Sequence, residues 1–271
     1  MTPQRDEAPF LAALRAGRAQ LVFGVRSSRT ADVVRIAQAT GHHGIMVDLE
    51  HSTMSVDTAA AICATARDLG LTAFVRVPEE DYGIVGRLLD GGADGIIFPR
   101  VETADQARRL TGAARFPPRG HRSQTAQLPQ NSLVPMPAAQ LNPLADAATI
   151  VKVLIETPLG VQNAAEIATV DGIDIVGIGA NDLTSELGIP GQYRDERIAA
   201  AVRTVVDAVT AVGKLGMIGG ISDQTILAEH LATGMSPFLL TGNDTDVLFE
   251  GARARTERWL DWHVALATQE G

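Results

Sequence analysis

The sequence predicts a single (β/α)8 barrel, the TIM-barrel fold, spanning residues 1–271. Three observations lead to this fold class. Short apolar runs alternate with amphipathic stretches, eight such runs can be counted, and glycines recur where a helical stretch gives way to the next run. Alternation of this kind is typical of βαβ units in a parallel sheet. Eight units in one chain of this length favour a closed barrel over an open, doubly wound sheet, which is the alternative.

The eight predicted strands are mostly rich in Val, Ile, Leu or Phe. They cover residues 21–25, 44–49, 73–77, 95–98, 150–155, 173–178, 215–218 and 238–241. Helical periodicity lies between them, for example at 56–69 and 196–212. Glycines that fit helix ends stand at positions 41, 70, 91, 92, 213 and 234. These turns mark the end of the barrel that serves stability, so we expect the chemistry in the loops after the strands.

The net charge of −9 and the pI of about 5.1 describe an acidic protein. Nucleic acids and anionic membranes need a basic footprint, so neither is expected as a partner. No run approaches the ~20 apolar residues of a membrane span, and the polar N-terminus lacks the pattern of a signal peptide. The expected location is the cytoplasm. The one cysteine, Cys63, cannot form an intrachain disulfide and fits a small core residue.

Two segments do not follow the regular alternation of predicted strands and helices. Residues 116–143 are rich in Pro, Gln, Asn and Arg, which predicts a long loop. It is interpreted as a lid over the active face, an arm into a neighbouring subunit, or a disordered surface excursion. Residues 245–268 predict a long helix that carries both tryptophans, Trp259 and Trp262. This helix is either the last barrel helix or an oligomer contact, because Trp is enriched at interfaces.

Charged side chains gather just after the predicted strands. Glu156 follows the fifth strand and Asp182 the sixth. Two carboxylates from separate strands suit a hard divalent cation, which keeps waters that a bidentate 2-oxoacid can displace. Such an ion stabilises an enolate as a Lewis acid. The alternative is that one or both carboxylates cap the following helix, since Asp182 directly precedes a helical stretch.

Two further strand ends carry candidates for substrate binding and proton transfer. Arg76, at the third strand, is a cation able to hold a substrate oxygen. It is also placed to pair with Asp48 or Glu50. His51 follows the second strand beside these two carboxylates, and its ordinary pKa near neutrality makes it the best general-base candidate.

The lysines separate two mechanisms of aldol chemistry. A Schiff-base aldolase needs a lysine that points into the barrel near its active end. The chain has only Lys152, early in its strand, and Lys214, before its strand. We expect both near the opposite end, so imine chemistry is disfavoured and a metal is the natural electron sink.

Four ordered motifs resemble the HpcH/HpaI aldolase family: 45–51 (IMVDLEH), 75–78 (VRVP), 155–157 (IET) and 177–183 (GIGANDL). The similarity runs from about residue 12 to about residue 254. It implies a phosphoenolpyruvate/pyruvate-type barrel with class II, metal-dependent aldolase activity. The implied substrates are a 2-oxoacid and an aldehyde, joined or separated through a pyruvate-type enolate.

The resemblance also implies the metal half of the site. Glu156 and Asp182 would bind Mg²⁺, Mn²⁺ or Co²⁺. Arg76 would contact the keto or enolate oxygen of the substrate. Asp48 would support either the metal-bound waters or Arg76.

The family resemblance also implies which residues transfer protons and which bind the substrate carboxylate. His51 would act as acid and base through a water, supported by Asp90, which in the family can come from a neighbouring subunit. The backbone at Ala180 and Asn181 would receive the substrate carboxylate. Family members form homo-oligomers, commonly a hexamer or trimer of dimers with an exchanged C-terminal helix, which fits the tryptophan-bearing tail.

Three positions depart from the family pattern. Leu154 stands where enterobacterial members have Gln, Arg100 stands where they have Met or a similar residue, and His121 has no clear counterpart. These changes concern the aldehyde half of the site and leave the natural substrate open. The alternatives are another carbon–carbon lyase on the same site (an acyl-CoA lyase, a decarboxylase or a macrophomate-synthase-like enzyme) and a metabolite-binding barrel without catalysis.

Overall fold

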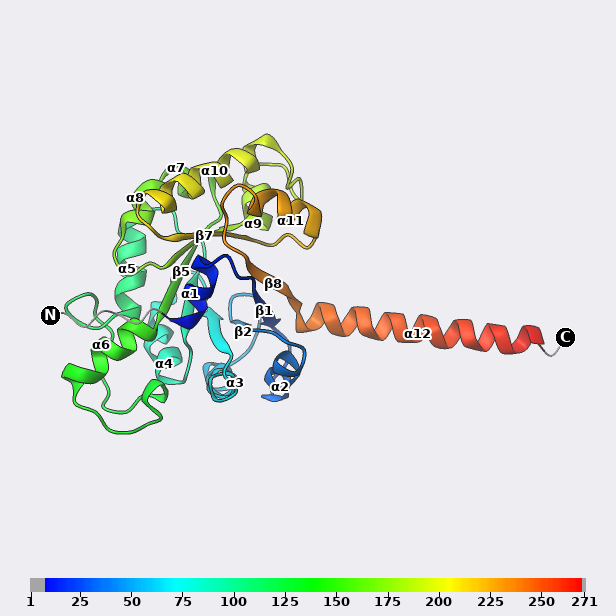
Figure 1. Ribbon diagram of the computed structural model, residues 1–271, viewed down its shortest axis with the longest axis horizontal. Helices are drawn as coiled ribbons and strands as arrows, with labels where there is room; N and C mark the ends of the chain where they lie inside the picture. Colours follow the sequence, from blue (N-terminus) through cyan, green and yellow to red (C-terminus); the bar gives the residue numbers. More distant parts are fainter. Residues whose placement is uncertain (1–7, 270–271) are drawn as a thin grey trace.

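The computed structural model describes residues 8–269, which form a nearly closed barrel of eight parallel strands surrounded by helices (Figure 1). The strands are β1 Gln20–Val25, β2 Gly44–Asp48, β3 Thr72–Arg76, β4 Gly95–Phe98, β5 Ile150–Ile155, β6 Ile175–Gly179, β7 Leu215–Gly219 and β8 Phe238–Asn243. The helices are α1 Pro9–Arg15, α2 Asp32–Ala39, α3 Val56–Asp68, α4 Val85–Asp90, α5 Ala104–Ala114, α6 Ala138–Ala148, α7 Pro158–Gln162, α8 Ala164–Thr169, α9 Ala180–Glu186, α10 Glu196–Ala211, α11 Gln224–Leu231 and α12 Asp244–Gln269. The predicted (β/α)8 fold is confirmed.

Neighbouring strands follow the chain order, with β8 returning to pair with β1. The two ends of the sheet, β7 and β8, are not joined by a ladder of hydrogen bonds. Ser236, just before β8, donates a backbone hydrogen bond of 2.7 Å to the carbonyl of Gly216 in β7. The barrel wall is therefore held at its base along this seam and is open above it.

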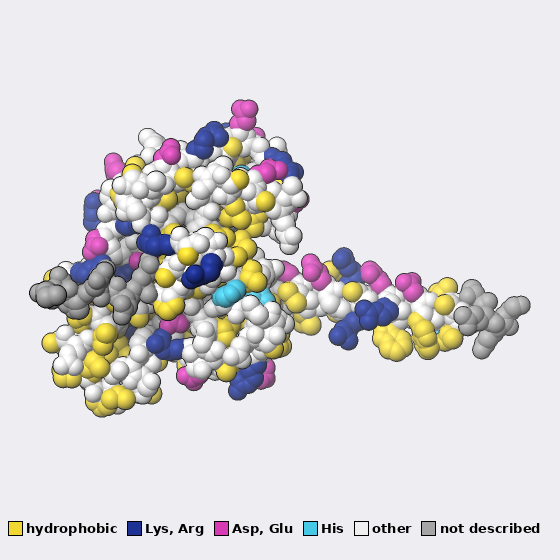
Figure 2. All heavy atoms as spheres, viewed as in Figure 1, with side chains coloured by type: hydrophobic (Ala, Val, Ile, Leu, Met, Phe, Trp, Pro, Cys, Tyr) yellow, Lys and Arg dark blue, Asp and Glu magenta, His cyan; other side chains and the backbone are white. Residues whose placement is uncertain are grey.

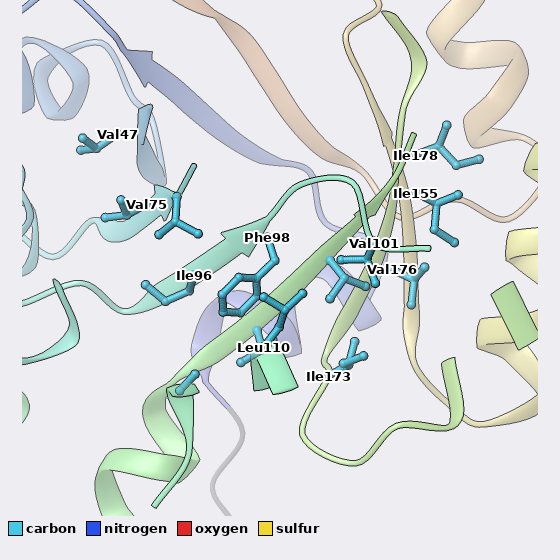
Figure 3. Close-up of a cluster of buried hydrophobic side chains, with 14 of the residues drawn as sticks. Val47, Val75, Ile96, Phe98, Val101, Leu110, Ile155, Ile173, Val176 and Ile178 are labelled. Atoms are coloured by element: carbon cyan, nitrogen blue, oxygen red, sulfur yellow. The ribbon is translucent and has the colours of Figure 1, made fainter. Parts of the chain in front are cut away.

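Side chains alternate between two apolar cores because successive strand residues point to opposite faces. Val47, Val75 and Ile96 point outward and pack under the helices, in the cluster drawn in Figure 3. Their neighbours Met46, Phe74 and Ile97 belong to the cluster inside the barrel, with Phe10, Leu11 and Leu14 of α1. The rings of Phe10 and Phe74 meet edge to face at 5.0 Å. Helix α1 thus closes the end of the barrel where the strands begin.

The predicted glycine turns are confirmed where helices end. Gly70 follows α3 with φ of 77° and Gly213 follows α10 with φ of 68°, a backbone region that other residues rarely adopt. Along residues 8–269, no helix has both the length and the apolar character that crossing a membrane requires.

The predicted loop at 116–143 is more ordered than its composition indicates. It contains a short 3-10 turn at Pro129–Asn131, and α6 begins at Ala138, inside the predicted range. Phe116, Leu128 and Leu141 are buried in a small apolar cluster of their own. The segment lies between α5 and β5, at the end of the barrel where strands begin. It is therefore not a lid over its own chain's active face.

Helix α12 has 26 residues and projects away from the barrel, contacting only β8 and β1 closely (Figure 1). Its bounds agree with the predicted helix at 245–268. Large apolar side chains remain exposed along it, including Trp259 at 65 % and Trp262 at 54 % (Figure 2). These two rings lie edge to face at 5.4 Å. Among residues 8–269 of one chain, no apolar surface covers these tryptophans.

Candidate active site

A cavity of about 600 Å³ opens at the ends of the strands and extends into the barrel interior. It brings together residues that are far apart in the sequence but share one end of the sheet. Its charged lining residues are Arg26, Arg76, Lys152, Glu156, Asp182 and Asp246. The backbone at Ala180 and Asn181 also lines it.

Glu156 is the most deeply buried carboxylate of this cavity lining, with 3 % of its surface exposed. The backbone N–H of Arg100 donates a 2.7 Å hydrogen bond to its Oε2, and Arg100 adopts a left-handed φ of 49° there. Gly179 lies beside it on β6, and a Cβ at that position would overlap Oε1 of Glu156. Burial raises the pKa of Glu156 to about 7, and the nearby carboxylates of Glu50 and Asp182 add to the shift.

Asp182 lies in the first turn of α9, on the same cavity as Glu156. The alternative that these carboxylates cap helices is wrong. The N-cap of α9 is Gly179, with no side-chain cap, and the N-cap of α7 is Thr157, whose hydroxyl accepts from the N–H of Gly160. Both carboxylates are therefore available to the cavity.

Arg76 is held by a bidentate pair with Asp48, in register on neighbouring strands. Its Nε and Nη2 donate to the two oxygens at 3.0 and 2.7 Å. Arg26 donates a third bond of 3.1 Å to Asp48, which is completely buried. Burial works to raise the pKa of Asp48, but the bonds and charge of Arg76 and Arg26 hold it below its ordinary value. The predicted Arg76–Asp48 pair is present and leaves Arg76 facing the cavity.

Glu50 is a third carboxylate near this site, considered from the sequence as a partner for Arg76 and as a neighbour of His51. Its Oε2 lies 3.2 Å from Nη1 of Arg76 and 3.7 Å from Nε2 of His51. That oxygen is buried and accepts no hydrogen bond from the described residues. Burial raises the pKa of Glu50. Its position two residues after Asp48, in the loop that follows β2, is the sequence signal that marks it as part of the site.

His51 and Asp90 lie apart within one chain. His51 is half exposed on the loop after β2 and does not line the cavity. Asp90 ends α4, at the opposite end of the barrel, where it accepts a 2.7 Å hydrogen bond from Arg122. A dyad of these residues therefore requires Asp90 from a second chain.

Lys152 corrects the expectation that both lysines lie near the opposite end. Its side chain points into the barrel and lines the same cavity as Glu156, because residues 152, 154 and 156 share one face of the strand. Lys214 does lie at the far end, where it donates to the carbonyl of Val170 at 2.5 Å.

A larger cavity of about 1270 Å³ lies around α1, α6 and Phe116, at the end where strands begin. Its charged side chains pair with one another, as Arg67 does with Asp94 and Arg119 with Asp146. Size alone does not identify a reactive site. The smaller cavity is the better candidate because Glu156 and Asp182, which line it, form no ion pair with any other residue in the described part of the chain.

The carboxylates of the smaller cavity fit a hard divalent cation. No group of three or more His, Cys, Asp or Glu side chains within residues 8–269 is arranged to hold a metal. Magnesium-type sites use only one or two carboxylates and complete their shell with water and substrate. Burial raises the pKa of Glu156 more than the charge of Arg76 lowers it, and the absence of a Cβ at Gly179 makes space for the Glu156 carboxylate. The donor set is therefore suitable for such an ion.

Comparisons with known proteins agree with this site. The sequence profile of the HpcH/HpaI aldolase/citrate lyase family matches residues 23–249. The chain is 37 % identical over 240 residues to 4-hydroxy-4-methyl-2-oxoglutarate aldolase tasA of Hapsidospora irregularis, covering 88 % of this chain and 89 % of that one. It is 32 % identical over 252 residues to a hydroxypyruvate/pyruvate aldolase of Delftia acidovorans, covering 93 % and 92 %.

A solved structure agrees as well. The HpcH/HpaI aldolase from Desulfitobacterium hafniense superposes with a TM-score of 0.83 at 25 % identity, covering 91 % of this chain and 95 % of that one. The fold, the cavity that contains Glu156 and Asp182, and the relatives lead to one assignment. The chain belongs to the HpcH/HpaI aldolase/citrate lyase family and is a carbon–carbon lyase, an aldolase of 4-hydroxy-2-oxoacids.

Proposed function

We propose that Glu156 and Asp182 hold a divalent cation, Mg²⁺, Mn²⁺ or Co²⁺, on which a 2-oxoacid binds for aldol cleavage or synthesis. The observation that carries the proposal is Glu156, a buried carboxylate that forms no close ion pair with the described residues and faces the cavity that Asp182 also lines. When bound, the ion acts as a Lewis acid that favours the enolate of the 2-oxoacid. Metal dependence is typical of the family, and the identity of the ion is part of the proposal.

Arg76 contributes a fixed positive charge. Its bonds to Asp48 and its contact with Glu50 prevent the guanidinium from turning away from the cavity. A preorganised cation of this kind stabilises negative charge that develops on the keto oxygen. The backbone N–H groups of Ala180 and Asn181 receive the substrate carboxylate, as the family resemblance implies.

His51 moves the proton. In cleavage, a water positioned by His51 accepts the proton of the 4-hydroxyl, the C3–C4 bond breaks, and its electrons form the enolate while an aldehyde or ketone leaves. In synthesis, the same route runs backward. Asp90 of a second copy would orient His51, because Asp90 of the same chain lies at the other end of the barrel. The location of the protein in the cytoplasm stays a prediction of the sequence.

Chelation tests the metal. Exhaustive EDTA treatment is expected to abolish cleavage of a 4-hydroxy-2-oxoacid, and Mg²⁺, Mn²⁺ or Co²⁺ should restore it, because the enolate then regains its Lewis acid. Pyruvate release, measured continuously, reports the reaction. Thermal unfolding of the chelated protein serves as the control, since titration with the ion should raise Tm through binding to the folded state alone. Full activity after chelation would contradict the proposal.

We also propose that α12 packs on another copy of the chain, in a hexamer or trimer of dimers. The support is the row of exposed apolar side chains on a projecting helix, since a large exposed apolar patch marks an interaction surface. Replacing Trp259 and Trp262 together by Ser is expected to yield smaller species in light scattering. Arg255→Ser, on the same exposed helix, is the matched control and should leave the mass unchanged. An unchanged mass for the Trp variant would contradict this role.

A further inference from the structure

Arg122 is a buried cation that the mechanism above does not use. Its side chain is completely buried, and its Nη2 donates a 2.7 Å hydrogen bond to Oδ1 of Asp90. The guanidinium lies over the ring of Phe116, with Cζ 4.6 Å from the ring centroid. Asp90 ends α4 and is the residue that the proposed mechanism takes from a second copy. The pair therefore joins a buried charge to a carboxylate that is assigned to proton transfer.

The segment between α5 and α6 holds the end of α4 in place. The backbone N–H of Arg122 donates at 2.9 Å to the carbonyl of Arg115, directly after α5. Gln130, in the same segment, donates from Nε2 at 3.0 Å to the carbonyl of Leu89, the residue before Asp90. Side chains of this segment thus bond to two consecutive residues at the end of α4, which restricts the orientation of the Asp90 carboxylate.

The two oxygens of Asp90 have different surroundings. Oδ1 accepts from Arg122, whereas Oδ2 accepts no hydrogen bond from any residue in the part of the chain that the structure describes. The side chain of Asp90 is 41 % exposed. A carboxylate that orients a catalytic imidazole needs one oxygen free for the ring N–H and support that fixes its own position. Asp90 has both, a free acceptor and a buried cation bound to its other oxygen.

Packing alone does not explain an arginine at position 122. Its Nε and Nη1 are buried and donate no hydrogen bond to any residue within 8–269. Burying polar groups without partners costs free energy, and an apolar side chain of similar volume in place of a buried ion pair is often neutral or stabilising. An apolar side chain would also cover the ring of Phe116. The charge of Arg122 is therefore best explained by what it does to Asp90.

We propose that Arg122 is a positioning residue for proton transfer, which holds Asp90 of its own chain in the orientation that receives the imidazole N–H of His51 in a second copy. The inference rests on the proposed function, because it supposes that Asp90 and His51 come from two copies. A charge-assisted hydrogen bond fixes a carboxylate strongly, and loss of such an outer partner typically costs about 10- to 100-fold in activity. Arg122 then acts on the active site of a neighbouring copy and not on that of its own barrel.

Mixed oligomers test which active site Arg122 serves. Two variants are co-expressed with different tags, and oligomers that carry both tags are assayed for pyruvate release. Arg122→Met mixed with His51→Ala should be several-fold more active than either variant alone, because the His51→Ala chain supplies an intact Asp90 and Arg122 to the His51 of the other chain. Arg122→Met mixed with Asp90→Ala should show no gain, because neither chain has both residues intact. No gain in the first mixture, or a gain in the second, would overturn the inference.

A third mixture, His51→Ala with Asp90→Ala, reports on the proposed function itself. A gain there without a gain for Arg122→Met with His51→Ala would overturn the role of Arg122 alone. No gain there would overturn the dyad between two copies, and the role of Arg122 with it. If Arg122→Met does not assemble, Arg122→Gln, which keeps a hydrogen-bond donor and removes the charge, replaces it in the mixtures.

A double variant and a control separate positioning from a structural effect. Adding Arg122→Met to Asp90→Ala should cause no further loss of kcat, since Arg122 acts through Asp90. A further loss as large as that in the wild-type background would contradict the inference. Arg119→Met is the matched control, because Arg119 lies in the same segment and also pairs with an aspartate, Asp171. Its activity should stay within about two-fold of the wild type, as expected for loss of an exposed ion pair.

Discussion

Glu156→Gln is expected to lower kcat/KM for aldol cleavage by at least about 10³-fold, because losing the Lewis acid removes several kcal/mol of transition-state stabilisation. Glutamine keeps the shape of the side chain and removes the charge that binds the cation. The measurement is pyruvate release at saturating metal ion. Activity within ten-fold of the wild type would exclude Glu156 as a metal ligand.

The same variant has a stability signature that activity alone does not provide. The folded-state pKa of Glu156 is raised from 4.5 to about 7, so between these values the folded protein binds more protons than the unfolded chain. The stability of the metal-free protein therefore falls as pH rises through this window, by roughly 3 kcal/mol at most. Glu156→Gln should lack this decrease and should gain no stability from added metal ion.

Asp182→Asn is the matched control for Glu156→Gln. Asp182 is exposed, so its replacement should reduce metal-dependent activity without removing the loss of stability between pH 4.5 and 7. Urea unfolding at several pH values, with and without the ion, separates the two effects. Identical pH profiles for both variants would show that burial of Glu156 is not the cause.

Arg76→Ala is expected to lose two reactions together, aldol cleavage and metal-dependent exchange of the methyl protons of pyruvate, because both pass through the same enolate. Removing a charge aimed at the developing oxyanion costs about 10²–10³-fold in kcat. The variant should also unfold more easily, by about 3–5 kcal/mol, since it leaves the completely buried Asp48 with Arg26 as its remaining cation. Normal proton exchange in Arg76→Ala would rule out its role.

Two variants control for charge and for packing around Arg76. Arg76→Lys keeps the charge but cannot form the bidentate pair with Asp48, so it should retain more stability than Arg76→Ala and little of the activity. Arg26→Ala removes a single hydrogen bond to the same carboxylate from a side chain that is one-third exposed. It should have the smallest effect on stability.

Much of the architecture could be predicted because it depends on local patterns. The strands are short apolar runs, and helix ends carry glycines with positive φ, such as Gly70 and Gly213. The approach of Glu156 to Asp182 follows from topology, since each stands just after one of two neighbouring parallel strands. Any residue at the end of a parallel strand shares one face of the barrel with its counterparts.

The depth of a side chain inside the barrel is harder to predict than the barrel fold itself. The sequence-based prediction for Lys152 uses only its distance from the end of the strand. Whether its side chain points into the barrel is decided by the alternation of strand residues, which puts it on the same face as Glu156. Helix α6 is not predicted from the composition of its segment, because Pro143 lies inside the helix and polar residues precede it. Within one chain Asp90 lies at the opposite end of the barrel from the loop of His51, so the proposed dyad needs a second copy, and no pattern within one sequence gives the distance between residues of two copies.

Gly179 and Glu156 form a pair that cannot vary independently. Oε1 of Glu156 occupies the space where a Cβ at position 179 would lie. Any larger amino acid at 179 would therefore require the Glu156 side chain to move or to be replaced by a shorter one. An evolutionary path that replaces this glycine must first exchange the glutamate for a smaller residue, and with it the reactivity of the pocket. The two positions should therefore be inherited together across descendants that keep the chemistry.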